Sequence, residues 1–139
     1  MTAETFGRAA LIWLVIAVLA VLNGFLREYV LVPFFGQETA LPLSGLLLSL
    51  IVVIVTWLSM GFFGRQNSAV YFLIGLQWVL MTLLFEIGLG RYVSGISWAE
   101  LLQLFNVRSG NLFSLVLFIS FIAPWRIARF KGLIQAEGK

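Results

Sequence analysis

Two charged side chains of this sequence lie in or beside long apolar stretches, where they could take part in chemistry. Glu86 lies within the apolar stretch 69–93, and Arg27 follows directly after the stretch 9–26. A charged residue inside a membrane is costly unless it is paired, protonated or hydrated, and it is therefore a candidate for function. Glu86 could bind a cation or a proton, and Arg27 could bind an anionic group.

The same two residues could instead form an ion pair that fixes the register of two helices. Arg91 follows Glu86 by five residues. In a helix of about 3.6 residues per turn, this places it about 140° around the axis, where it cannot easily turn to the carboxylate. The partner of Glu86 is expected from another helix. Arg27 is the best candidate because it is expected at a similar depth in the membrane. A binding site and a structural ion pair are therefore both open interpretations.

Further polar residues are expected at the same end of the helices. Asn23 lies one helical turn before Arg27. Thr82 lies one turn before Glu86 in the same way, and residues four positions apart share a helix face. We therefore predict one polar pocket or ion-pair cluster. Its candidate residues are Asn23, Arg27, Glu28, Thr82, Glu86 and Arg91.

The missing residue types exclude several kinds of active site. The chain contains no Cys and no His, and its six acidic residues are all Glu. Zinc sites with Cys or His ligands, His-ligated haem and Ser-His-Asp triads are therefore excluded. Glu86 with Tyr29 or Tyr92 could do acid–base chemistry on a lipid, but nothing in the sequence orients them. We predict no catalytic residues, no metal and no cofactor, and hence a protein that is not an enzyme.

The composition predicts that the chain lies in a membrane. Of its 139 residues, 61% are hydrophobic and 11% are charged, and the mean hydropathy is +1.04. Soluble domains carry roughly 25% charged residues. The net charge of +3 and the pI of about 9.8 do not indicate binding of nucleic acid, because much of the basic excess lies at predicted membrane borders, where Lys and Arg anchor helices.

Four apolar stretches are long enough to cross a bilayer, which takes about 20 residues of helix. They must be helical in the hydrocarbon region, because unpaired backbone groups are costly there. We therefore predict an all-α polytopic membrane protein, a bundle of four transmembrane helices in a single membrane domain over residues 1–139. The predicted spans are about 9–26, 44–64, 69–93 and 111–130.

The basic residues predict the direction of the helices. With four spans, both termini lie on one side of the membrane. That side holds six of the nine Lys and Arg residues, namely Arg8, Arg65, Arg126, Arg129, Lys131 and Lys139. The opposite side holds Arg27, Arg91 and Arg108. Because Lys and Arg are enriched in cytoplasmic loops, we expect both termini in the cytoplasm, a location in the cytoplasmic membrane of the cell, and a polar cluster near the outer face.

The predicted outer loop 94–110 contains a signal for the start of a helix. Ser97 and Glu100 have the spacing of a capping box. The apolar residues beside them fall on one face at helical spacing, namely Trp98, Leu101, Leu102 and Phe105. We predict a short interfacial helix at about 98–106, lying on the outer surface. This helix could close the bundle, or it could act as a lid over a cavity.

The other predicted outer loop, 29–43, carries three residues that break helices. Pro33, Gly36 and Pro42 predict that no long helix passes through it. The loop also holds too many apolar residues for a solvated segment. We therefore expect an irregular segment that dips into the membrane interface or packs on the bundle, where protein or water can satisfy its backbone.

Two parts of the chain resemble each other at an offset of 65 residues. The pattern S-G-x-L-x-S-L occurs at 44–50 and again at 109–115, and Trp13 and Trp78 are also 65 residues apart. A repeat would produce two helical hairpins that run in the same direction, related by a two-fold axis along the membrane normal. A chance match between two apolar hairpins is the alternative.

A resemblance to known proteins rests on three short segments. The stretches LNGFLRE at 22–28 and FEIG at 85–88, together with Ser97-Trp98, resemble those of small bacterial four-span membrane proteins without assigned function. This resemblance implies the four-span fold and no mechanism. The chain does not resemble small multidrug transporters, whose first helix carries an acidic residue where this one has Asn23. The Gly-Asn signature and the phenylalanine pairs of fluoride channels are not evident either.

Two functions from different classes fit these observations. The first is a small integral membrane protein with an outward-facing polar pocket that binds or transports a small ion or solute. A four-span protein usually has to oligomerise to enclose a pathway for a solute across the membrane. The second is a non-catalytic partner or scaffold for another membrane protein, with a polar cluster that is structural. Membrane lipids are expected partners in both cases, and a homo-oligomer or a membrane-protein partner is a further alternative.

Overall fold

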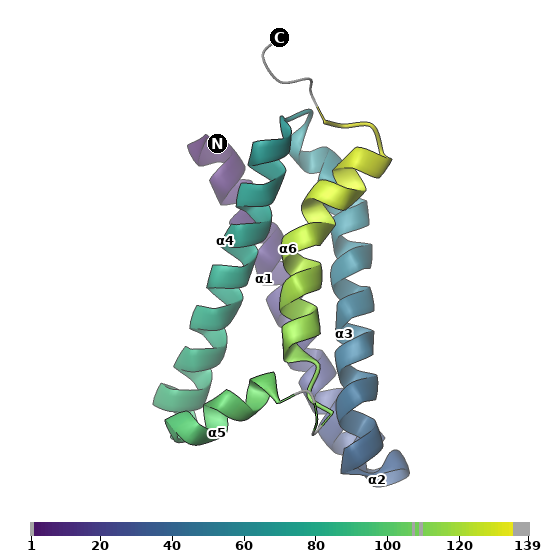
Figure 1. Ribbon diagram of the computed structural model, residues 1–139, viewed down its shortest axis with the longest axis vertical. Helices are drawn as coiled ribbons and strands as arrows, with labels where there is room; N and C mark the ends of the chain where they lie inside the picture. Colours follow the sequence, from purple (N-terminus) through teal and green to yellow (C-terminus); the bar gives the residue numbers. More distant parts are fainter. Residues whose placement is uncertain (1, 107, 109, 135–139) are drawn as a thin grey trace.

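The computed structural model describes residues 2–106, 108 and 110–134. These described residues are almost entirely helical, and the pairing among them that resembles a β-sheet is one bridge between Gln66 and Ile134. The helical segments long and apolar enough to cross a membrane are Ala3–Phe35, Gln37–Phe63, Ser68–Val93 and Phe113–Phe130. The predicted all-α, multi-pass membrane bundle is therefore confirmed (Figure 1).

Three of the spans are built from more than one kind of helix. The elements in chain order are α1 (Ala3–Leu26), the π-helical η1 (Arg27–Leu31), α2 (Val32–Phe35), α3 (Gln37–Ser59), the 3-10 helix η2 (Met60–Phe63), α4 (Ser68–Ile87), the π-helical η3 (Gly88–Val93), α5 (Trp98–Leu102), the 3-10 helix η4 (Gln103–Phe105) and α6 (Phe113–Phe130). π-Helical turns are rare and often occur at functional sites. Both of them here directly follow the main helix of a span.

The spans form one bundle with two different ends. α6 packs against α3 and α4, and α1 packs against the same two helices. α1 begins and α6 ends at one end of the bundle, which we call the terminal end (Figure 1). α2 and α5 lie at the opposite end, which we call the α2/α5 end. The hairpins α1–α3 and α4–α6 therefore run in the same direction, as the predicted repeat requires.

The packing is tightest toward the terminal end. Tyr71, Ile74 and Trp78 of α4 are fully buried there. A Cβ atom added at Gly75 would lie 2.1 Å from the carbonyl oxygen of Phe121 in α6, so α4 and α6 approach this closely only because the residue is Gly. From this contact α4 leans away from α6 toward the α2/α5 end, where α5 crosses the space between them (Figure 1).

The connection between the first two spans differs from the predicted irregular loop 29–43. Helical backbone continues through Pro33 and resumes at Gln37, and Gly36 alone separates α2 from α3, with φ +84°. Pro33 is tolerated because it lies in the first turn of α2, where the missing N–H costs little. Pro42 lies inside α3. The prediction was therefore wrong at both prolines and right at Gly36, whose left-handed conformation favours glycine.

The predicted helix at about 98–106 is present in a slightly shorter form. α5 and η4 together cover Trp98–Phe105. The Ser97 hydroxyl oxygen accepts a hydrogen bond from the Glu100 N–H at 3.2 Å, as a capping box requires. The Glu100 carboxylate accepts a hydrogen bond from the Ser97 hydroxyl at 3.3 Å, and not from the Ser97 backbone N–H. Leu101 of α5 packs directly against Gly90 of η3. The approach is so close that a Cβ atom added at Gly90 would lie 2.4 Å from Cδ2 of Leu101.

Candidate functional site

A cavity of about 270 Å³ lies between the spans at the α2/α5 end. It is partly open and is lined by residues of α1, η1, α3, α4, η3, η4 and α6, and most of its wall is apolar. The polar residues that line it are Asn23, Arg27, Ser44, Glu86 and Asn111. We call this space the polar cavity. It brings together three of the six residues predicted as a cluster, and each of the three comes from a position near the end of a main span helix.

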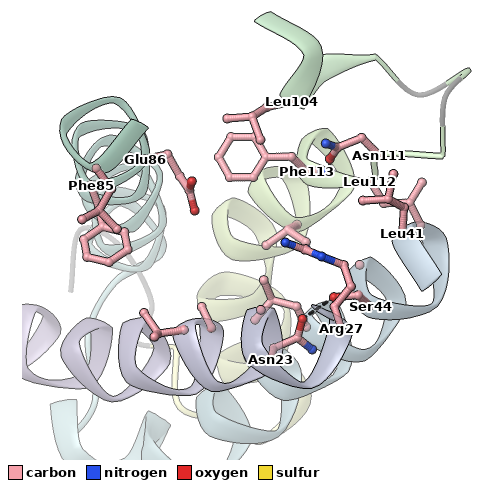
Figure 2. A pocket seen from close by; sticks show the side chains of 17 residues that line it. Asn23, Arg27, Leu41, Ser44, Phe85, Glu86, Leu104, Asn111, Leu112 and Phe113 are labelled. Atoms are coloured by element: carbon pink, nitrogen blue, oxygen red, sulfur yellow. Dashed lines mark hydrogen bonds between the residues drawn. The ribbon is translucent and has the colours of Figure 1, made fainter. Parts of the chain in front are cut away.

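Arg27 is the first residue of η1 and reaches into the polar cavity (Figure 2). Its Nε donates to Oε1 of the neighbouring Glu28 at 3.2 Å. This pair is partly exposed, and such pairs contribute little to stability. The contact occupies Nε alone, and Nη1 and Nη2 have no hydrogen-bond partner among the described residues. Arg27 therefore keeps the two nitrogens that can bind an anion in a bidentate manner.

Glu86 enters the same cavity from α4, on the opposite wall from Arg27 (Figure 2). The predicted ion pair between these two residues is not formed. The ion pairs among the described residues are Arg8–Glu4 and Arg27–Glu28, and the Glu86 carboxylate has no hydrogen-bond partner there. The physical reason is that α4 leans away from the rest of the bundle at this end, which leaves the two charges facing each other across a space.

Asn23 and Ser44 form a buried polar contact beside Arg27. The Ser44 hydroxyl donates a hydrogen bond to Oδ1 of Asn23, which joins α1 to α3 (Figure 2). Asn23 is 5% exposed, and its amide Nδ2 has no hydrogen-bond partner among the described residues. A buried donor left without a partner costs about 1–3 kcal/mol. Nδ2 is itself buried, so this unpartnered donor lies behind the wall of the polar cavity and is not open to a bound molecule.

The other three predicted cluster residues lie outside the polar cavity. Glu28 is exposed beside Arg27. Thr82 accepts a hydrogen bond from Nε1 of Trp13 at 3.0 Å and lines a small adjoining cavity of about 30 Å³. The guanidinium group of Arg91 lies over the ring of Trp98 at 5.6 Å. These residues have structural partners, so the cluster predicted from six residues is smaller than expected.

Two polar residues of the polar cavity were missing from the predicted cluster. Ser44 is buried in α3, and Asn111 lies just before α6. Ser44 lies in the first copy of the S-G-x-L-x-S-L pattern, and Asn111 lies in the second. Their position along the spans could have identified them, because both lie near the same end of the bundle as Asn23 and Glu86. The sequence did not show that their side chains face the cavity. The predicted spans begin at residues 44 and 111, whereas α3 begins at Gln37 and α6 at Phe113.

A second, apolar cavity of about 200 Å³ adjoins the first. It lies between α4 and the segment formed by α5 and η4, and Glu86 is the one charged residue among the described residues that line it. Its apolar lining consists of Leu83, Ile87, Trp98, Leu101, Leu102, Leu104, Phe105 and Phe113. We call this space the apolar cavity. The predicted apolar face of helix 98–106 lines it.

The arrangement suits binding of a charged molecule better than catalysis. Neither Tyr29 nor Tyr92 lines either cavity, and both side chains are largely exposed. No group of three or more acidic residues that could hold a metal ion is present among the described residues. What remains is one cationic group, one anionic group and amide and hydroxyl groups around a shared space. Such a set can hold a ligand by charge and hydrogen bonding.

Comparisons with known proteins add no assignment. No family model, no curated protein and no solved structure matches the chain. The resemblance of the segments 22–28 and 85–88 to small bacterial four-span proteins therefore stays a prediction. The function has to be inferred from the two cavities and from the residues that line them.

Proposed function

We propose that this membrane protein binds a small charged solute in the polar cavity, with Arg27 and Glu86 as the residues that contact it. The observation that carries the proposal is that these opposite charges face one cavity without forming an ion pair with each other. A charge in a poorly solvated site is costly unless it has a partner. A purely structural cluster would be expected to pair the two groups directly.

The size and the polar wall of the cavity support the same proposal. A volume of about 270 Å³ is just below the range of about 300–1,000 Å³ that is usual for ligand sites. It can hold several water molecules or one small solute. Arg27 and Glu86 supply one cationic and one anionic group inside it. A small solute with at least one charged group fits this wall.

We further propose that the α2/α5 end faces the outside of the cell. The terminal end carries aromatic and basic pairs that are typical of membrane anchors. Lys131 lies over the ring of Trp57 at 4.6 Å, and Arg129 lies over the ring of Trp125 at 5.5 Å. Such pairs mark a membrane interface, as Arg91 and Trp98 do at the α2/α5 end. The excess of basic residues at the terminal end is what favours a cytoplasmic location for it.

The orientation can be tested by labelling single cysteines, because the chain has none of its own. Glu38→Cys reports on the α2/α5 end and Glu4→Cys on the terminal end, and both sites are exposed. We expect a membrane-impermeant maleimide to label Glu38→Cys in intact cells, and to label Glu4→Cys only after the membrane is opened. The reverse pattern would contradict the proposed orientation.

Binding can be tested by a thermal-unfolding screen of the purified full-length protein. The screen uses inorganic cations, small amines, organic anions and zwitterions. A compound that binds the native state raises the unfolding temperature. We expect at least one charged compound to raise it in the wild type, and to have little effect in Glu86→Gln or Arg27→Gln.

Glu28→Gln is the matched control, because it removes a carboxylate next to Arg27 that does not line the cavity. We expect this variant to keep the response. If no compound raises the unfolding temperature, and Glu86→Gln and Arg27→Gln simply unfold more easily, the cluster is structural. That outcome would favour the role of a partner or scaffold for another membrane protein.

A further inference from the structure

We infer that the bound molecule is a zwitterionic phospholipid of the phosphatidylethanolamine type, with its headgroup in the polar cavity and an acyl chain in the apolar cavity. This inference rests on the proposed function, because it names the class of ligand that the same site binds. Its starting point is that Glu86, Leu104 and Phe113 line both cavities. The polar and the apolar spaces are therefore neighbours, and one amphiphilic molecule can occupy both.

The charges of the polar cavity match an ethanolamine phosphate headgroup. A phosphate is an anion that Arg27 can bind through Nη1 and Nη2, which have no partner among the described residues. A primary ammonium group donates three hydrogen bonds and suits the carboxylate of Glu86. The headgroup carries both charges a few atoms apart, which explains why the two side chains face each other across a space instead of touching (Figure 2).

The apolar cavity suits an acyl chain that enters from the bilayer. One wall is formed by Leu83 and Ile87 of α4, and the other by α5 and η4. Leu102 is 67% exposed and Trp98 is 53% exposed, although both line this cavity. The cavity therefore borders the outer surface of the bundle, where lipid chains would surround it. A charged solute without a tail would leave this space unused.

The depth of the site in the membrane is also the depth expected for a lipid headgroup. Tyr29 of η1, Tyr92 of η3 and Trp98 of α5 are large, exposed aromatic residues near the α2/α5 end. Tyr and Trp are enriched where the hydrocarbon region of a bilayer meets the headgroups. The polar cavity lies at the same end of the bundle, so the charged groups of a lipid would meet Arg27 and Glu86 without leaving the headgroup layer.

The test is native mass spectrometry and thermal unfolding of the full-length protein in detergent with four probes. The probes are lysophosphatidylethanolamine, phosphatidylethanolamine, phosphatidylglycerol and free O-phosphoethanolamine. We expect both ethanolamine lipids to bind about tenfold or more tightly than O-phosphoethanolamine, because burial of even two methylene groups changes affinity by about that factor. We expect phosphatidylglycerol to bind more weakly than phosphatidylethanolamine, because it lacks the ammonium group for Glu86.

Two variants and a control locate the acyl chain. Leu83→Trp fills the apolar cavity and should reduce binding of lysophosphatidylethanolamine to the level of O-phosphoethanolamine. Leu84→Trp is the control, because Leu84 is 72% exposed and does not line the cavity. Leu102→Gln places an amide on the exposed rim and is the second variant if Leu83→Trp does not fold. Equal lipid binding by the cavity variants and the control would overturn the assignment of the tail.

The outcomes separate this inference from the proposed function. If O-phosphoethanolamine binds as tightly as the lipids and needs Glu86, the headgroup site is real and the acyl-chain site is wrong. If phosphatidylglycerol binds as well as phosphatidylethanolamine, the ammonium contact is wrong. If neither these probes nor the charged compounds of the screen bind, the proposed function fails together with the inference.

Discussion

At the terminal end of the bundle the large buried side chains of α4 pack tightly and donate hydrogen bonds, whereas at the α2/α5 end the charged groups of Arg27 and Glu86 face a cavity. Nε1 of Trp78 donates to the carbonyl of Ala9 at 2.9 Å, and the Tyr71 hydroxyl donates to the carbonyl of Gly64 at 3.0 Å. At the α2/α5 end the carboxylate of Glu86 has no hydrogen-bond or ion-pair partner among the described residues. Buried polar atoms without a partner among these residues occur in both halves of the bundle, namely Nδ2 of Asn23 and Oε1 of Gln77. One helix bundle therefore combines a closed end with an open one.

The difference shows how a small membrane protein can hold charged groups apart. The contact of α4 with α6 at Gly75 fixes the two helices near the terminal end. From there α4 diverges, and α5 fills only part of the space at the other end (Figure 1). The closed end supplies the stability, so the polar cavity can keep unsatisfied groups that would otherwise drive its collapse. The predictions below test this division of roles.

The largest expected effect is at the closest contact of the closed end. In Gly75→Ala the new Cβ would lie 2.1 Å from the carbonyl oxygen of Phe121, so α4 and α6 must separate. Overpacking of this kind costs about 1–3 kcal/mol or more, and we expect about 3 kcal/mol here. Denaturant unfolding in detergent measures the loss. Gly7→Ala is the control, because no atom lies within 4 Å of that position; an equal loss there would refute the role of Gly75.

A smaller loss is expected when a satisfied polar group at the closed end is removed. Trp78 is fully buried, and Trp78→Phe deletes both ring volume and the hydrogen bond to Ala9. We expect a loss of about 2 kcal/mol in the free energy of unfolding. The same unfolding assay measures it. A loss below about 0.5 kcal/mol, the size of an ordinary surface substitution, would show that the closed end is less tightly packed than described.

The corresponding change at the open end is expected to have little effect on stability. Asn23→Leu removes a buried amide whose Nδ2 has no partner among the described residues, together with its contact to Ser44. The desolvation cost of that donor disappears with it, whereas the buried Ser44 hydroxyl loses its acceptor. Because the two effects are of similar size and opposite sign, we expect a net change within about 1 kcal/mol. Ligand binding should weaken at the same time. A large loss of stability without a loss of binding would mean that Asn23 is a structural residue.

The positions of the spans could be predicted from the sequence, but the helix boundaries could not. Long apolar stretches identify membrane helices directly. The segment 29–43 was predicted wrongly because prolines usually break helices, whereas Pro33 lies in the first turn of α2 and Pro42 is accommodated inside α3. The π-helical turns at Arg27–Leu31 and Gly88–Val93 left no signal in hydropathy, and they shift the faces of the residues that follow.

The candidate site could be predicted only in part for a related reason. Asn23, Arg27 and Glu86 were identified because charged and amide groups are rare in apolar helices. Thr82 and Arg91 lie on the same span as Glu86, yet they contact Trp13 and Trp98 instead of the polar cavity. Helix rotation and the divergence of α4 decide such contacts, and neither is encoded in residue spacing. The apolar cavity depends on the same divergence and was not predicted.

The central claim is that Arg27 and Glu86 are held apart to bind a ligand and are not a structural pair. A double-mutant cycle with Arg27→Gln, Glu86→Gln and the double variant tests it most directly, with unfolding measured in detergent free of added lipid. We predict a coupling energy below about 1 kcal/mol, because the two charges attract each other across the cavity but share no contact. A coupling energy above about 1 kcal/mol, as expected for groups in direct contact, would contradict the claim and establish the ion pair.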